Sequence, residues 1–205
     1  MIDLDPRDRL LQDLTPVIPL PRFGKALAAL NVPGHRYLVA EDGLWIEVKR
    51  AWLSMRARIA DAVDVALPFG RAADPEHNIQ GTYAFSDDNL ARLQTLFLHD
   101  ARAALPDEFA AWGVWNERTR IIEYRPLVAI EASPGGITFS RPRLEDHEHL
   151  AVDLHSHGTM APFFSATDDA DDRGEVKISV VAGNLDTEPS FHTRLCLLGL
   201  FVDAE

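Results

Sequence analysis

The sequence predicts an α+β fold, in which a mixed β-sheet with flanking helices follows a small, β-rich N-terminal domain. Three observations carry this prediction. Many short segments alternate apolar and polar residues, as half-buried strands do. One long amphipathic helix pattern begins at residue 86. A stretch rich in proline, glycine and acidic residues (68–78) separates the early strand patterns from that helix, so we expect domains at 1–83 and 84–205.

The N-terminal domain is expected to contain a β-hairpin. Residues 1–34 carry five prolines and are expected to be irregular, apart from a short helix at 25–30. Residues 37–48 contain two apolar segments around an Asp-Gly pair, which is a strong hairpin signal. Residues 52–67 fit both a helical stripe and a strand alternation, and the alternation in their first half favours a strand.

The C-terminal domain is expected to open with a helix that begins after Ser86 and ends before Pro106. Ser86 suits a helix N-cap, and two aspartates follow it at the positive end of the helix dipole. Apolar residues then recur at spacings of three and four: Leu90, Leu93, Phe97, Ala101 and Ala104. The strands of the sheet are expected at 111–115, 121–124, 128–131, 137–139, 150–157, 176–181 and 193–201.

The charge and composition of the chain exclude several classes of function. The formal net charge of −12 repels polyanions, so we expect no nucleic-acid partner. No apolar run is long enough to span a bilayer, and the N-terminus lacks the pattern of a signal peptide, so we expect no membrane partner. The single cysteine, Cys196, cannot form an internal disulfide, as expected of a cytoplasmic protein.

The segment from His155 to Asp168 has the residue types and spacing of a metal site. Side chains two apart on a strand lie on one face, so His155 and His157 can point together. A tight return through Gly158 and Pro162 could bring Asp168 to the third corner. Two histidines and one carboxylate leave a fourth position for water, as in catalytic zinc sites. The alternation puts Leu150, Val152 and Leu154 on one face of this strand, and Asp153, His155 and His157 on the other.

Other interpretations apply to parts of the same segment. Ser165 and Asp168 also have the pattern of a helix capping box, which is compatible with a ligand in the first helical turn. The acidic run 168–174 suggests a calcium loop, but an EF-hand alignment puts an arginine and a valine at ligand positions. His147 and His149 continue the alternation in an acidic loop, and we interpret them as surface residues.

The complete pattern, H-x-H, seven residues, then S-x-x-D, resembles that of the JAMM (JAB/MPN) zinc metalloprotease family. The resemblance covers about residues 84–205. It implies a JAB/MPN-like fold and one Zn²⁺ per chain, held by His155, His157 and Asp168. It also implies that the substrate is a ubiquitin-like protein or its conjugates.

The family motif also contains a glutamate upstream of the histidines. Glu108, which lies 47 residues before His155, matches this glutamate best. Two positions depart from the family pattern. The glycine that follows the glutamate is displaced by about one residue, to Gly113, and Gly158 replaces a frequent proline. Glu123 therefore stays a second candidate for the same role.

The resemblance implies a zinc-dependent (iso)peptidase that acts at the C-terminus of a ubiquitin-like protein. Zinc lowers the pKa of its bound water, and Glu108 would accept the proton of that water. Ser165 would donate a hydrogen bond to the oxyanion. Asp153 could bond to an imidazole ligand and orient it without touching the metal, or could be a solvated charge. The alternative is a zinc-bearing but catalytically silent scaffold in a protein complex.

The sequence around Ser165 and the additional N-terminal domain also resemble protein A of the bacterial PRTRC gene cassettes. Such cassettes encode an activating-enzyme-like protein of the ThiF type. This resemblance implies a ubiquitin-like partner in the bacterial cytoplasm. Domain 1–83 is then expected to bind the substrate or another protein of the cassette.

Overall fold

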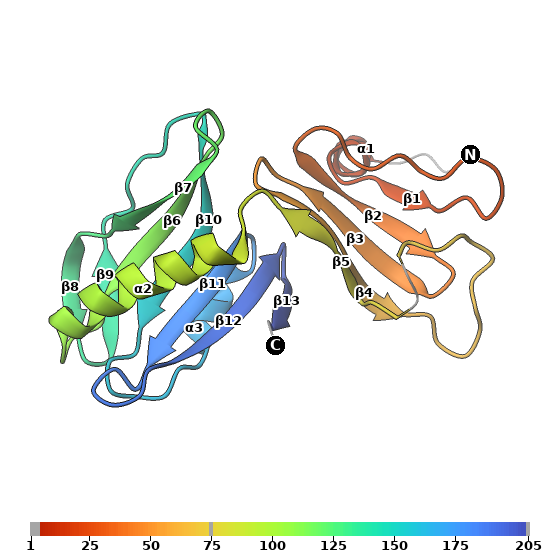
Figure 1. Cartoon of the computed structure of the whole chain (residues 1–205). Helices are drawn as coiled ribbons and strands as arrows, with labels where there is room; N and C mark the ends of the chain where they lie inside the picture. Colours follow the sequence, from red (N-terminus) through yellow and green to blue (C-terminus); the bar gives the residue numbers. More distant parts are fainter. Residues whose placement is uncertain (1–4, 74–75, 204–205) are drawn as a thin grey trace. The chain divides into compact units, whose positions relative to one another are not determined.

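A computed structural model describes residues 5–73 and 76–203 of the chain. The chain divides into two compact units, Met1–Ala84 and Phe85–Glu205, each with its own β-sheet (Figure 1). The α+β class with a β-rich N-terminal part is confirmed. Predictions that concern residues 1–4 and 74–75 lie outside the described residues. Within residues 5–73 and 76–203, no helix is both long and apolar enough to cross a bilayer.

The N-terminal unit is a five-stranded sheet whose strands follow the order of the chain. The expected hairpin is present as β2 and β3. Its turn requires Gly43, which has φ +140 and where a Cβ would lie 2.0 Å from the carbonyl oxygen of Ala60. The segment after Trp52 begins with a strand, as its alternation predicts. The elements are α1 (Pro6–Leu14), β1 (Val17–Pro19), β2 (Gly34–Ala40), β3 (Gly43–Lys49), β4 (Leu53–Asp61) and β5 (Ile79–Tyr83).

Two predictions for the first 34 residues are wrong. Residues 25–30 form no helix. The carbonyl oxygen of Ala28 instead accepts a hydrogen bond from Nη2 of Arg36, 2.5 Å away. A helix forms earlier, at Pro6–Leu14, where the side chain of Asp5 caps the amino end and a proline occupies the first turn. An Asp-Pro pair is a helix-start signal, and the high proline content of the region concealed it.

A six-stranded sheet organises the C-terminal unit, in the order β13-β12-β11-β10-β6-β7. The β10–β11 pair is parallel and the other neighbouring pairs are antiparallel, so the sheet is mixed, as predicted. A separate two-stranded hairpin consists of β8 and β9. The elements are α2 (Asp87–Ala104), β6 (Ala110–Asn116), β7 (Ile121–Pro126), β8 (Ala129–Ser133), β9 (Gly136–Phe139), β10 (Glu148–Ser156), α3 (Ala166–Asp172), β11 (Val176–Gly183), β12 (Ser190–Leu197) and β13 (Leu200–Asp203).

Different elements cover the two faces of this sheet (Figure 1). Helix α2 packs on one face through its buried Leu93, Phe97 and Ala101. Gly113 of β6 permits this approach, because a Cβ there would lie 2.7 Å from Cδ1 of Leu93. The β8–β9 hairpin packs against the residues of β6 that point away from α2, namely Ala110, Trp112 and Val114. Helix α3 is hydrogen-bonded to β11 and β12 through Asp172. The hairpin and α3 therefore share the other face.

Strand β10 departs from the predicted alternation at one point. A β-bulge between Leu150 and Val152 shifts its register against β6. Val152 lies beside Gly113, on the face of α2, whereas Leu150 packs against residues of β6 that face the hairpin. The prediction that Leu150 and Val152 share a face is therefore wrong. Asp153 and His155 lie beyond the bulge and keep a common face.

The last predicted strand, 193–201, is a tight hairpin instead of one continuous strand. Strand β12 ends at Leu197 and β13 begins at Leu200. Between them, Leu198 and Gly199 have φ values of +54 and +100, and this left-handed pair reverses the chain. The run of leucines around the turn made the segment look uniformly extended.

Candidate metal centre

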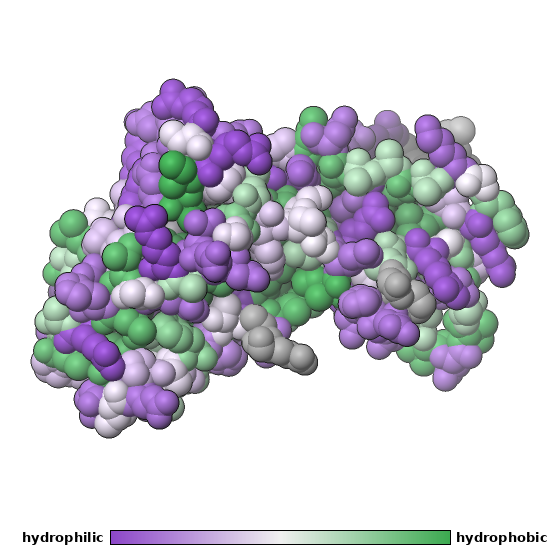
Figure 2. Space-filling view, viewed as in Figure 1, coloured by the Kyte–Doolittle hydropathy of each residue, from purple (hydrophilic) through white to green (hydrophobic). Residues whose placement is uncertain are grey.

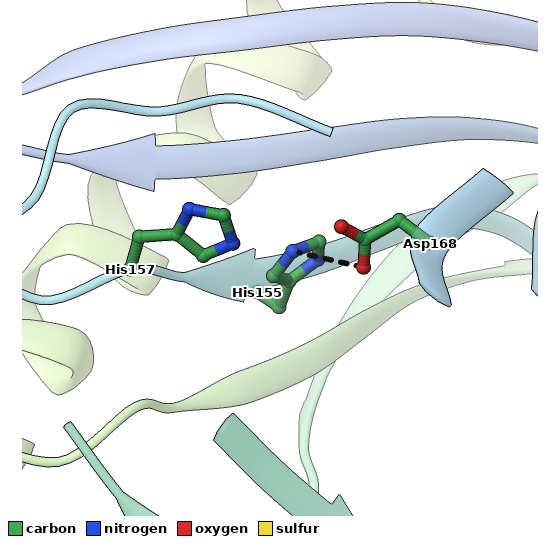
Figure 3. A group of neighbouring side chains, drawn as sticks. All are labelled: His155, His157 and Asp168. Atoms are coloured by element: carbon green, nitrogen blue, oxygen red, sulfur yellow. Dashed lines mark ion pairs between the residues drawn. The ribbon is translucent and has the colours of Figure 1, made fainter. Parts of the chain in front are cut away.

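Strand β10 places two histidines at its carboxyl end. His155 lies in the strand opposite Ala110 of β6, and His157 follows the last residue of β10. The backbone N–H of His157 donates to the carbonyl oxygen of Ala182 (2.8 Å), which holds the end of the strand against β11. The two imidazole rings lie side by side, with their centroids 5.2 Å apart (Figure 3).

The third member of the group is the carboxylate of Asp168, in the first turn of α3. Ser165 is the N-cap of this helix and forms a reciprocal capping box with Asp168. Oδ2 of Asp168 accepts hydrogen bonds from the N–H (2.6 Å) and from the hydroxyl (2.7 Å) of Ser165. Oδ1 lies 3.4 Å from Nε2 of His155. The cap therefore engages one carboxylate oxygen and leaves the other for a metal ion.

The geometry and chemistry of these three side chains fit a zinc ion. One ligand atom from each of His155, His157 and Asp168 lies within 4.8 Å of the others. Tetrahedral zinc with bonds of about 2.0–2.1 Å holds its ligand atoms roughly 3.4 Å apart. Nε2 of His155 is buried and, among the described residues, has no hydrogen-bond partner. Burial, followed by the nearby His155, lowers the pKa of His157 and favours the neutral imidazole that binds metals.

Glu108 lies beside this group because β6 and β10 are antiparallel neighbours. Ala110, two residues after Glu108, pairs with His155. The N–H of Phe109 donates to the hydroxyl of Ser156 (2.9 Å), and the N–H of Ser156 donates back to the carbonyl oxygen of Phe109 (2.9 Å). These reciprocal bonds join the start of β6 to the end of β10, and so bring Glu108 to the cavity that the histidines line.

The environment of Glu108 changes its acidity. The residue is buried, with 7% of its surface exposed. Burial, followed by the negative charge of Asp168, raises the pKa of Glu108 from 4.5 to about 7. The two carboxylates are therefore close enough to interact. A carboxyl group that titrates near neutral pH can both accept and return a proton under physiological conditions.

The second candidate glutamate lies elsewhere on the sheet. Glu123 is on β7 opposite Val114 of β6, and Val114 is opposite Leu150 of β10. Leu150 precedes His155 by five positions, which is roughly 15 Å along the strand. The side chain of Glu123 is 41% exposed and forms an ion pair with an arginine of its own strand. Glu123 therefore points to a different part of the surface from the metal ligands.

The side chains of the candidate metal centre line one cavity of about 270 Å³. Its lining combines the three candidate ligands, Glu108 and Ser165 with residues of the β8–β9 hairpin. Five carboxylates line it, against only two cationic side chains, Arg141 and Lys177. The resulting negative potential favours a divalent cation in the cavity.

Two predicted site residues form hydrogen bonds that bear on their predicted roles. The hydroxyl of Ser165 has one proton, and it points to Oδ2 of Asp168. Donation to an oxyanion would therefore require this hydroxyl to rotate. Oδ2 of Asp153 accepts a hydrogen bond from Nζ of Lys177 (2.5 Å), so its observed partner is a lysine and not an imidazole.

Two further histidines lie at the opposite end of β10. Nε2 of His147 is 2.6 Å from Nη2 of Arg118, and Nε2 of His149 is 3.3 Å from a carboxylate oxygen of Glu117. Both histidines are partly exposed. Neither lines the cavity of the metal centre.

Two cations that were not predicted to belong to the site, Lys177 and Arg194, connect α3 to the sheet. Each has only 4% of its surface exposed. A signal was present, since Lys177 lies within the strand pattern Val-Lys-Ile-Ser-Val-Val and Arg194 precedes Leu-Cys-Leu-Leu. A cation inside an apolar strand requires a buried counter-charge, which the acidic run 168–172 supplies.

Two family models match the chain, one over each unit. Residues 90–196 match the family model described as prokaryotic homologs of the JAB domain, and residues 5–79 match a domain of unknown function, DUF2016. No curated protein matches the chain. The solution structure of protein DSY2949 from Desulfitobacterium hafniense aligns with 56% of this chain and 86% of that chain, at 16% identity and a TM-score of 0.42. Because the JAB match spans more than half of the chain, this protein belongs to the prokaryotic JAB family and carries a DUF2016 domain before its JAB domain.

Proposed function

We propose that this JAB-family protein is a zinc-dependent peptidase that hydrolyses a peptide or isopeptide bond at the C-terminus of a ubiquitin-like protein. One observation carries the proposal. The ligand atoms of His155, His157 and Asp168 converge within 4.8 Å, and Glu108 lines the same cavity with a pKa raised to about 7. A three-ligand set with a neighbouring carboxyl base is the arrangement of a hydrolytic zinc site, whereas structural zinc sites have four protein ligands.

These side chains of the cavity would have distinct roles in hydrolysis. His155, His157 and Asp168 would hold the zinc ion, which when bound supplies a Lewis acid and lowers the pKa of water. Glu108 would accept a proton from the attacking water and deliver it to the leaving amine. A cation held by the triad favours the ionised form of Glu108 that can act as a base. Ser165 would rotate its hydroxyl from Asp168 to donate a hydrogen bond to the oxyanion.

The proposed partners follow from the resemblance to the PRTRC cassettes and from the charge of the chain. The substrate would be a ubiquitin-like protein or its conjugates, and an activating-enzyme-like protein of the ThiF type would be a further partner. The DUF2016 domain would bind one of them. The net charge of −12 supports a role without nucleic acid. The bacterial cytoplasm is the proposed location because the PRTRC resemblance implies it.

The zinc site is tested by the metal content of the purified protein. We expect about one zinc per chain, and its loss in the double variant His155→Ala/His157→Ala. The matched control is His147→Ala/His149→Ala, which removes two histidines from the other end of β10 and should keep the metal. A full zinc load in the first variant would overturn the assignment of the ligands.

The activity is tested with a ubiquitin-like protein that carries a fluorogenic amide at its C-terminus. Copurification with a Glu108→Ala variant would identify which ubiquitin-like protein to use. We expect zinc-dependent release of the fluorophore by the wild type. A protein that holds zinc but cleaves neither this probe nor a lysine conjugate would be the silent scaffold instead.

A further inference from the structure

Helix α3, which carries the third metal ligand, is held in place by contacts outside itself. It spans Ala166–Asp172 and contains four aspartates in seven residues. A helix this short is not stable alone, and its aspartates repel one another. Asp171 and Asp172 also lie at the carboxyl end, where the helix dipole disfavours negative charge. The position of Asp168 therefore depends on what α3 binds.

Asp172 joins the end of α3 to the sheet. It is 4% exposed, and its Oδ2 accepts hydrogen bonds from the hydroxyl of Ser179 (2.8 Å) and from Nη2 of Arg194 (2.8 Å). Its Oδ1 lies 2.8 Å from Nζ of Lys177. The same ammonium group binds Asp153 of β10, two residues before the first histidine ligand. Lys177 thus connects α3 to the strand that carries the histidines.

Arg194 contacts both sides of the turn that carries Asp168. Its Nη1 donates to Oδ1 of Asp169 (2.5 Å), the residue after the ligand. Its guanidinium lies over the ring of Phe164, with 3.8 Å from Cζ to the centroid. Phe164 is the residue before the N-cap Ser165. Arg194 also lies over the ring of Phe201 of β13, with 4.1 Å from Cζ to the centroid.

We propose that Arg194 is a positioning residue for the metal centre, which fixes the S-x-x-D turn so that Asp168 meets the two histidines. This inference rests on the proposed zinc site. The guanidinium is suited to the role because its planar fork bonds two carboxylates of α3 while it also lies over two aromatic rings. Lys177 supports it from the side of β11. Zinc affinity should therefore depend on Arg194, although this side chain does not bind the metal.

The test compares the zinc affinity of full-length variants by competition with a chelating dye. Arg194→Lys keeps the charge but loses the fork and the stacking. We expect its zinc dissociation constant to rise by about 10- to 100-fold, as for other residues that orient metal ligands. The visible absorption of the Co²⁺-loaded protein should change as well, because Asp168 moves. A purely structural role would lower stability without altering this spectrum.

The matched control is Arg125→Lys. Arg125 also forms ion pairs with two carboxylates, Glu123 and Glu148, but on β7, away from the metal centre. It should leave zinc affinity and the Co²⁺ spectrum unchanged. A second variant, Phe201→Leu, removes one stacking partner of Arg194 at a partly exposed position, without a change in charge. We expect it to weaken zinc binding by about two- to fivefold.

The outcomes separate this inference from the proposed function. Wild-type affinity and an unchanged Co²⁺ spectrum in both Arg194→Lys and Phe201→Leu would overturn the positioning role and leave the zinc site intact. If Arg194→Lys does not fold, Phe201→Leu replaces it as the test. Weakened zinc binding in Phe201→Leu would then support the positioning role, and wild-type affinity with an unchanged Co²⁺ spectrum would overturn it. A wild-type protein that binds no zinc would overturn the proposed function itself, and the positioning role with it.

Discussion

The carboxylate of Asp168 shows how one residue can satisfy two interpretations of the same pattern. As part of a capping box, its Oδ2 bonds to the N–H and hydroxyl of Ser165. As a candidate metal ligand, its Oδ1 lies 3.4 Å from Nε2 of His155. The cap fixes the rotation of the carboxylate before any metal binds. Such preorganisation lowers the conformational entropy that metal binding must overcome.

At the same scale, Glu108→Gln separates the base from the ligands. The amide keeps the shape of the side chain but cannot accept a proton, so turnover should fall by about two to four orders of magnitude. Zinc content should stay at the wild-type level, because Glu108 is not one of the three converging ligands. The measurements are steady-state hydrolysis and metal analysis. Glu123→Gln is the control, and loss of activity there with full activity in Glu108→Gln would reverse the assignment.

The raised pKa of Glu108 also predicts a pH dependence of stability. In the metal-free protein its folded-state pKa is about 7, above the value of 4.5 in the unfolded chain. The native state therefore binds the proton more tightly, and its stability falls as pH rises from about 4.5 to about 7. By linkage, the cost above pH 7 reaches about 3 kcal/mol at most.

The Glu108→Gln variant lacks this titration. Its free energy of unfolding should match that of the wild type near pH 4 and exceed it at pH 8, by about 1–3 kcal/mol. Urea unfolding at both pH values, with a chelator present, measures the difference. A constant difference between the two proteins across this range would contradict the prediction.

At the scale of elements, the candidate metal ligands lie at or next to the ends of a strand and a helix. Strand β10 ends at Ser156, between the two histidines, and α3 begins directly after Ser165. The ends of elements leave backbone groups free for side-chain caps, and they permit sharp changes of direction. The reciprocal bonds between Phe109 and Ser156 then align the start of β6 with the end of β10.

Gly113 belongs to the packing of α2 and not to the catalytic motif. A Cβ at this position would lie 2.7 Å from Leu93 and 2.9 Å from Val152, both in the core. Gly113→Ala should therefore destabilise the protein by about 1–3 kcal/mol through overpacking. Gly135→Ala, where a Cβ meets nothing within 4 Å, is the control. Equal midpoints of thermal unfolding for the two variants would show that α2 can move away without cost.

At the scale of the whole molecule, the chain consists of an N-terminal unit and a C-terminal unit that contains the acidic candidate metal centre. The C-terminal unit buries its own set of apolar residues, among them Phe97, Leu154, Val180 and Leu197. Its surface carries both polar and apolar areas (Figure 2). The strongly negative charge favours cations and disfavours polyanions.

A fragment of residues 84–205 should fold by itself, because it contains α2, the six-stranded sheet and the complete metal centre. We expect a single cooperative unfolding transition and a zinc content equal to that of the full chain. Circular dichroism and metal analysis measure these properties. An aggregated fragment that binds no zinc would mean that the N-terminal unit completes its core.

The sequence by itself determined the features that depend on neighbouring residues. Strand alternation indicated most of the strands, and Ser86 and Ser165 indicated the starts of two helices. The spacing from His155 to Asp168 indicated the three side chains that converge in the candidate metal centre. Cap and alternation signals operate over a few residues, so no knowledge of the rest of the fold is needed to interpret them.

Only the tertiary structure decided what depends on the pairing of distant segments. The antiparallel register of β6 and β10 brings Glu108, and not Glu123, to the cavity. The bulge before Val152 moves Leu150 to the other face, which no alternation could indicate. The bonds of Arg194 to Asp169 and Asp172 join residues more than twenty positions apart. These arrangements follow from the packing of the entire sheet, because strand pairing is set by burial and by contacts between segments remote in sequence.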